Sequence, residues 1–150
     1  MRFMKKAAVL MIPIALIIAA AVIYLVSLSG TRLDMDGNNI RGIRIEQQPE
    51  FYNIGPISVT NEAEIKLITD YLNALELKSP NHNPNEYVGS AFIFTIVNKD
   101  GTERTIVHFG NKFLRANDEW YEISYEQASR FDEDIYPNLE ATYEHFHHVE

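Results

Sequence analysis

The first 31 residues contain a long run without charge: no Asp, Glu, Lys or Arg occurs between Lys6 and Arg32. Residues 7–28 are apolar almost throughout, and about 20 such residues suffice for a helix to cross the hydrocarbon layer of a membrane. The sequence therefore predicts a transmembrane helix over residues 7–28. Because positively charged flanks stay on the cytoplasmic side, the basic segment 1–6 is expected in the cytoplasm.

This orientation predicts a single-pass protein of the cell membrane, with a cytoplasmic N-terminus and an extracytoplasmic C-terminal part held by a signal anchor. A signal peptide cleaved after Ser29 is the alternative, because the small residues Ser27 and Ser29 precede Gly30. The apolar region of a signal peptide usually spans about 7–15 residues. The longer run in this chain favours retention as an anchor.

The rest of the chain has the size of one domain and is strongly acidic. From Arg32 onward it carries ten Lys or Arg against 21 Asp or Glu, a net charge of −11. Because nucleic-acid binding needs a basic surface, this balance argues against a nucleic-acid partner. The chain has no Cys, which excludes disulfides and cysteine chemistry. Burial of apolar side chains must therefore stabilise the domain.

Turn-forming residues divide this part into three segments: a tether at 29–39, a domain at 40–137 and an acidic, His-containing tail at 138–150. The domain pattern begins with a strand that alternates apolar and polar residues over 40–46. A helix is predicted after Asn61, because Glu64 follows at the capping-box spacing.

Residues 90–123 then read as short antiparallel strands joined by tight turns, the first of them at Asp100-Gly101. A second helix is predicted over 125–136, ended by Pro137. Strands and helices are segregated in this order, which is typical of α+β proteins. The expected architecture is an N-terminal transmembrane helix followed by a small antiparallel β-meander sheet packed with one or two helices.

Two stretches resemble a known group of small exported domains. They are Ile-Ser-Val-Thr-Asn-Glu-Ala-Glu-Ile-Lys-Leu-Ile-Thr-Asp-Tyr-Leu-Asn (57–73) and, after an apolar strand and an Asp-Gly hairpin, Asn-Asp-Glu-Trp-Tyr-Glu-Ile (117–123). Such domains of unknown function occur on membrane-anchored or lipoprotein chains of Gram-positive bacteria. The resemblance covers residues 40–136 and implies an extracytoplasmic location. It implies no activity and no catalytic residues.

No pattern in the chain indicates an enzyme. There is no G-x-S-x-G turn for a serine nucleophile and no glycine-rich loop for phosphate. We therefore expect neither catalytic residues nor a cofactor. His145, His147 and His148 are candidate metal ligands, since imidazole binds zinc, copper and nickel. An extracytoplasmic metal-binding or metal-sensing protein is therefore the alternative function.

Four aromatic residues form the candidate partner-binding surface: Tyr87, Phe113, Trp120 and Tyr121. Alternation along a strand places Trp120 and Tyr121 on opposite faces, so one should pack on a helix while the other is exposed. The leading hypothesis is a membrane-anchored, extracytoplasmic accessory module that binds a protein partner at the cell surface. The identity of the partner and the oligomeric state stay open.

Overall fold

The computed structural model describes residues 17–18, 31–49 and 55–147, with side chains up to Tyr143. Residues 1–30 and 31–150 form two separate units. The second unit contains the sheet and the helices that pack on it.

The described residues include no helix that is both long enough and apolar enough to cross a membrane. This finding overturns the predicted transmembrane helix over residues 7–28. The predicted single-pass topology and membrane location depended on that helix, so these two predictions are wrong as well. Apart from Ile17 and Ile18, the predicted span lies outside the described residues, as does the basic segment 1–6.

The second unit is built on a six-stranded sheet in which all neighbouring strands are antiparallel. Its strands are β1 (Ile40–Gln48), β2 (Ile57–Val59), β3 (Ala91–Asn98), β4 (Glu103–Phe109), β5 (Phe113–Ala116) and β6 (Glu119–Glu122). Their spatial order is β2-β1-β3-β4-β5-β6, so β3 to β6 form the expected meander. The long connection from β2 to β3 returns the chain to the other side of β1.

Left-handed backbone conformations close the meander's turns. Gly101 has φ 86° in the first turn, and Gly110 and Asn111 have φ 58° and 51° in the second. Asn117 and Asp118, with φ 52° and 64°, form the two-residue turn between β5 and β6. Two central residues with positive φ match the twist of a tight hairpin, and Asn and Asp tolerate this conformation better than most residues.

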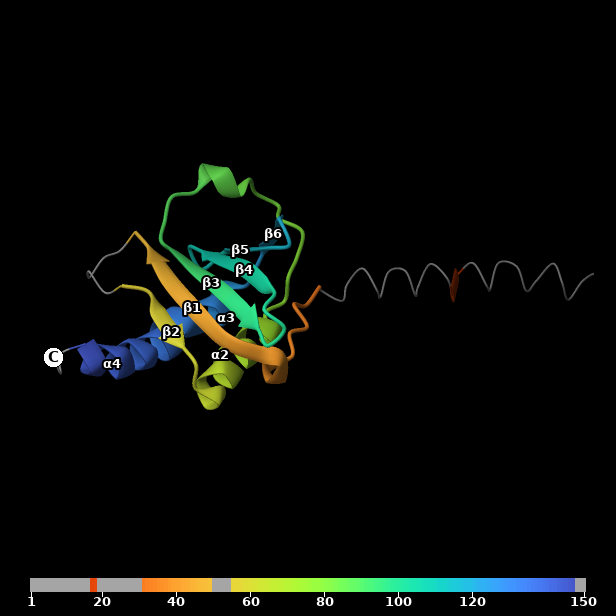
Figure 1. The fold of residues 1–150 in the computed structure, drawn as a ribbon. Helices are drawn as coiled ribbons and strands as arrows, with labels where there is room; N and C mark the ends of the chain where they lie inside the picture. The colour runs from red at the N-terminus through yellow and green to blue at the C-terminus, as the bar shows by residue number, and fades with distance from the viewer. Residues whose placement is uncertain (1–16, 19–30, 50–54, 148–150) are drawn as a thin grey trace, which may run out of the picture. The chain divides into compact units, whose positions relative to one another are not determined.

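The longer helices of the second unit lie between β2 and β3 and after β6. They are α2 (Glu62–Ala74), α3 (Tyr125–Arg130), the π-helical turn η3 (Phe131–Ile135) and α4 (Tyr136–His147), with the short 3-10 turns η1 (Gly37–Asn39) and η2 (Pro84–Glu86). Figure 1 shows α2 and α3 behind the same face of the sheet. The α+β class and the antiparallel meander agree with the sequence prediction, whereas its transmembrane helix does not.

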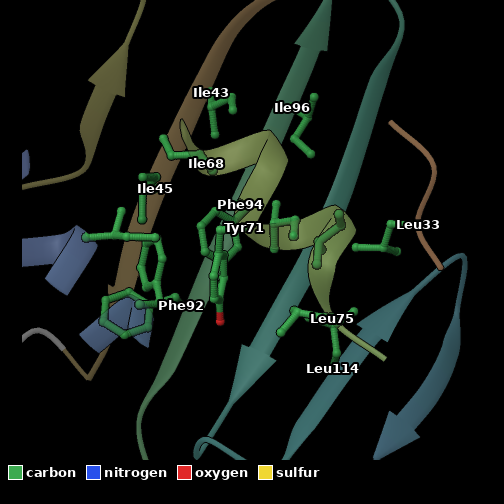
Figure 2. Packing of buried hydrophobic residues seen from close by; sticks show 14 of the residues in the cluster. Leu33, Ile43, Ile45, Ile68, Tyr71, Leu75, Phe92, Phe94, Ile96 and Leu114 are labelled. Carbon is green, nitrogen blue, oxygen red and sulfur yellow. The ribbon is translucent and has the colours of Figure 1, made fainter. Parts of the chain in front are cut away.

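Helix α2 begins where the sequence predicts. The Asn61 side chain accepts hydrogen bonds from the backbone N–H groups of Ala63 and Glu64, at 2.9 and 3.3 Å. The apolar side of α2 then enters the core, where Ile68 and Leu72 are fully buried. Figure 2 shows Ile68, Tyr71 and Leu75 directed at side chains of β1, β3 and β5.

The folded unit extends beyond the predicted domain at its N-terminal side. Thr31 and Leu77 exchange two backbone hydrogen bonds, of 3.1 and 3.0 Å. Leu33 is buried in the core, and the Asn73 side chain bonds both the backbone N–H and the carbonyl of Met35. Residues 31–39, expected as a tether, therefore pack on the domain.

The C-terminal helices continue into the segment from Asn138, which the sequence predicts to be helical but polar all round. Pro137 was expected to end the second helix, yet α4 starts at Tyr136 and runs to His147. In the π-helical turn, the N–H of Tyr136 bonds the carbonyl of Phe131, five residues back. The helical backbone is continuous from η3 into α4, and Pro137 follows the π-helical turn, where the regular hydrogen-bond ladder is already interrupted. Leu139 is buried, so the start of the predicted tail contributes to the core.

Candidate binding surface

The strand register separates the sheet into two faces of different character. One row across β1, β3, β4 and β5 pairs Ile45, Phe94, Ile106 and Ala116, and none of these is more than 2% exposed. We call this side, on which the helices pack, the covered face. The opposite side is the open face.

On the open face, the neighbouring row pairs Glu46, Ile93, Val107, Arg115 and Trp120 across five strands. Ile93, Val107 and Trp120 are half-buried, and Arg115 is exposed. Figure 1 shows α2, α3 and α4 on the far side of these strands. The described helices therefore leave apolar side chains of this face in contact with solvent.

Three of the four predicted aromatic residues lie on the open face. Phe113 and Phe109 are paired across β5 and β4. The Tyr87 ring meets the Phe113 ring edge-on at 5.0 Å, and the Trp120 ring meets the Phe109 ring at 6.3 Å. Tyr87, Phe113, Phe109 and Trp120 thus form one aromatic row, which we call the aromatic row of the open face.

The members of this row differ in accessibility. Phe113 is 1% exposed, because Tyr87 packs over it, whereas Tyr87 itself is 38% exposed. Phe109 and Trp120 are half-buried. Aromatic pairs in this geometry stabilise each other by about 0.5–1.5 kcal/mol beyond their buried area. The row therefore presents ordered rings of which Trp120, Phe109 and Tyr87 remain reachable.

A loop over residues 78–90 holds Tyr87 in place. Its residue Asn81 donates a backbone hydrogen bond to the Glu122 carboxylate at 3.0 Å, and the His82 ring lies 3.7 Å from the same carboxylate. The Lys112 ammonium donates to the Tyr87 hydroxyl at 3.0 Å and lies 4.7 Å from the ring centre. The backbone hydrogen bond from Asn81 lowers the pKa of Glu122, and the charge of the Lys112 ammonium adds to this effect.

Tyr121, the fourth predicted residue, lies on the covered face. It pairs with Leu114 and packs, partly buried, against the core. Its hydroxyl donates to the Glu119 carboxylate at 2.9 Å, and this hydrogen bond raises the pKa of Tyr121. Trp120 and Tyr121 thus point to opposite faces, as their alternation predicts, and Trp120 is the member on the open face.

The open face also carries two ion pairs. Arg44 and Glu46 of β1 lie 3.0 Å apart, and Arg115, which stands between Val107 and Trp120 in the row across the strands, lies 3.0 Å from Asp118. All four side chains retain contact with water, so each pair contributes little to stability. Apolar and aromatic side chains beside an exposed Arg are a composition that protein-binding surfaces often have.

The predicted metal ligands lie at the limit of the described chain. His145 and His147 belong to the backbone of α4, but the described side chains end at Tyr143, and His148 lies outside the described residues. Within the described part, no group of three or more His, Cys, Asp or Glu could hold a metal ion. The metal-binding alternative stays a prediction.

Two hollows adjoin the segment Asp34–Asn39, away from the aromatic row. Their volumes are about 500 and 530 Å³, and both are lined by Met35, Asp36 and Lys99. The Asp36 carboxylate caps η1 by accepting bonds from the backbone and side chain of Asn38 and from the side chain of Asn39. This carboxylate is therefore used in the fold.

Sequence reasoning missed three residues of the open face: Ile93, Val107 and Phe109. Residues 90–97 have apolar side chains on both sides of the predicted strand, which predicts cover on both faces. The structure shows cover on one face, since Phe92, Phe94 and Ile96 are buried and Ile93 and Val97 are half-buried. No local signal in the sequence tells which side of such a strand stays uncovered.

No protein-family model, curated protein or solved structure matches this chain. The resemblance to exported Gram-positive domains therefore stays a prediction.

Proposed function

We propose that the chain is a binding module that recognises a protein partner through the open face of its sheet. The observation that supports this proposal is the half-buried apolar group Ile93, Val107, Phe109 and Trp120, which the described helices leave uncovered. Transfer of apolar surface from water to a partner contributes about 25 cal/mol per Å². Trp is also among the residues that most often dominate binding energy at interfaces.

The surroundings of this group favour specific binding. Trp120 is held against Phe109, and Phe109 is paired with the buried Phe113, so the rings are ordered before a partner arrives. Preorganised side chains lose less conformational entropy on binding. The exposed ion pairs Arg44–Glu46 and Arg115–Asp118 would then set orientation more than affinity.

The proposal is tested by quantitative affinity capture with the full chain and with Trp120→Ser. Leu67→Ser is the matched control, because Leu67 is 46% exposed but lies on α2, away from the open face. We expect Trp120→Ser to lower recovery of a specific partner at least tenfold, as loss of a binding hot spot does, and Leu67→Ser to leave it unchanged.

A partner found in this way is then measured directly by calorimetry against both variants. Equal binding by the wild-type chain and Trp120→Ser would contradict the proposal, as would a loss of the same size in Leu67→Ser. Circular dichroism of each variant confirms that the sheet is intact.

A further inference from the structure

His108 is a basic side chain enclosed in the apolar core. It lies on the covered face of β4 and is 1% exposed, and neither of its ring nitrogens has a hydrogen-bond partner in the described structure. Buried imidazoles almost always satisfy at least one nitrogen, so this ring is an exception. Burial lowers the pKa of His108 from 6.5 to about 4, because the charged ring would lose its hydration.

Aromatic rings surround this imidazole. The Phe92 ring stacks on it at 6.3 Å, the Phe131 ring meets it edge-on at 6.3 Å, and the Tyr71 ring lies at 6.4 Å. The residues paired with His108 in the sheet are Phe92 and Leu114. These surroundings therefore suit a neutral imidazole. None of these neighbours is a carboxylate that could pair with a protonated His108.

The titratable groups that face this region come from α2, α3, η3, α4 and β6. The hydroxyl of Tyr71 on α2 donates a hydrogen bond to the carbonyl of Ala128, at 3.2 Å. Tyr121 of β6 lies one strand further away, beside Leu114. Tyr136 begins α4, and burial raises its pKa and that of Tyr71, so both phenols stay neutral around pH 7.

Arg130 and Asp132 carry charges close to Tyr71, whose pKa Asp132 raises and Arg130 lowers. Burial raises the pKa of Asp132, and one of its carboxylate oxygens is buried without a hydrogen-bond partner. Neither residue forms an ion pair with His108. The described structure thus contains nothing that would compensate a proton on the buried ring.

Phe131 connects this ring to the C-terminal helical segment, which we define as residues 125–143. Phe131 is fully buried and its ring contacts Phe92, Phe94 and His108, so it joins the π-helical turn to the sheet. A π-helical turn departs from the regular hydrogen-bond ladder of a helix and often marks a functional site. A positive charge on His108 would therefore act on the C-terminal helical segment through the contact with Phe131.

We propose that His108 is an acid-sensitive latch, whose protonation releases the C-terminal helical segment from the covered face of the sheet. In the released state the imidazole reaches water and keeps its proton at no desolvation cost. The sheet and α2 retain their own contacts in the core. The latch is independent of partner binding by the open face.

The direction of the effect follows from the two states of the ring. His108 holds its proton less tightly when enclosed, with a pKa of about 4, than when exposed, with a pKa of 6.5. Acidification below 6.5 therefore favours release, and the effect levels off below pH 4. Linkage gives a release equilibrium about 20-fold higher at pH 5 than at pH 7, and about 100-fold higher at pH 4. Asp132 acts the other way, because its raised pKa lets protonation favour the enclosed state.

The test is hydrogen exchange of the full chain, followed by mass spectrometry between pH 7 and pH 4 and corrected for intrinsic rates. We expect opening of residues 125–143 to rise toward pH 4 by up to the factors above, because Asp132 offsets part of the effect, while β1 and β3 stay protected. His108→Gln, which does not titrate, should remove this rise. His82→Gln is the matched control, because His82 is exposed and its loss should leave the dependence intact.

Direct titration by NMR decides the matter even if His108→Gln fails to fold. A His108 ring that titrates near pH 4, or only together with exchange of residues 125–143, supports the latch. Titration near pH 6.5 in an unchanged folded spectrum overturns it. Loss of protection in β1 and β3 together with the helical segment overturns it too, because the release would then be global unfolding.

Discussion

The two faces of the sheet are made by the same strands, yet their side chains are buried to different extents. On β4, Ile106 points to the covered face and is fully buried, whereas its neighbour Val107 points to the open face and is half-buried. Both are β-branched aliphatic residues in the same strand. The difference therefore comes from what packs over each face, namely α2 and the C-terminal helical segment over one face and the loop 78–90 over part of the other.

The largest expected effect is at the centre of the covered face. Phe94 is fully buried and contacts Phe131, so Phe94→Ala should lower the free energy of unfolding by about 3–5 kcal/mol. Urea unfolding followed by circular dichroism measures this loss. Thr95→Ala, one residue further on the open face, is the control and should cost less than about 1 kcal/mol. Equal losses would mean that the two faces are not energetically distinct.

A second substitution tests whether the loop 78–90 buries one part of the open face. Phe113 faces the same side as Phe109 but is sealed by Tyr87, so Phe113→Ala should cost about 2–4 kcal/mol. Phe109→Ala, at the half-buried position opposite, should cost clearly less. The same urea experiment gives both values. A smaller loss at Phe113 than at Phe109 would show that the loop 78–90 does not act as part of the core.

The third prediction concerns the attachment of that loop. Glu122→Gln should weaken it by less than about 1 kcal/mol, since the carboxylate that accepts from Asn81 is partly exposed to water. Because the pKa of Glu122 is lowered in the fold, its contribution is present near neutral pH and is lost as the pH falls through that pKa. Hydrogen exchange of residues 79–90 at pH 7 and pH 3 measures both effects. Equal protection in Glu122→Gln and wild type at pH 7 would refute this role.

The smallest expected effect is at the middle of the open face. Val107→Thr should change the free energy of unfolding by no more than about 0.5 kcal/mol, as substitutions near the surface usually do. Ile106→Thr, one residue away on the covered face, buries a hydroxyl and should cost at least about 2 kcal/mol. If Val107→Thr were as damaging as Ile106→Thr, an additional element would have to cover the open face.

Local signals in the sequence predicted the elements well. The cap at Asn61, the Asp100-Gly101 turn and the alternation along the strands each act over a few residues, and the structure agrees with them. Among the expectations that failed is the transmembrane helix over 7–28, which rested on apolarity and length alone. Apolar composition indicates that a segment avoids water, but it does not specify the structure that it adopts.

Features that depend on distant residues were not predictable. The burial of Leu33 depends on a backbone pairing between Thr31 and Leu77, and no local pattern encodes that pairing. Likewise, Tyr87 reaches Phe113 across a loop that looks irregular in sequence. The candidate site was therefore anticipated as a set of aromatic residues, whereas its arrangement into a row with Phe109 depends on the strand register.

The pairing of Lys78 with Glu122 has a consequence for how a partner can approach. These residues exchange two backbone hydrogen bonds, of 3.0 and 2.8 Å, along the outer edge of β6. Edge strands with free N–H and C=O groups invite a further strand from another chain. At β6 those groups of Glu122 are already used, and the strand is only four residues long. Addition of a further strand is thus hindered at the Glu122 end of this edge, so contacts made there would rest mainly on side chains.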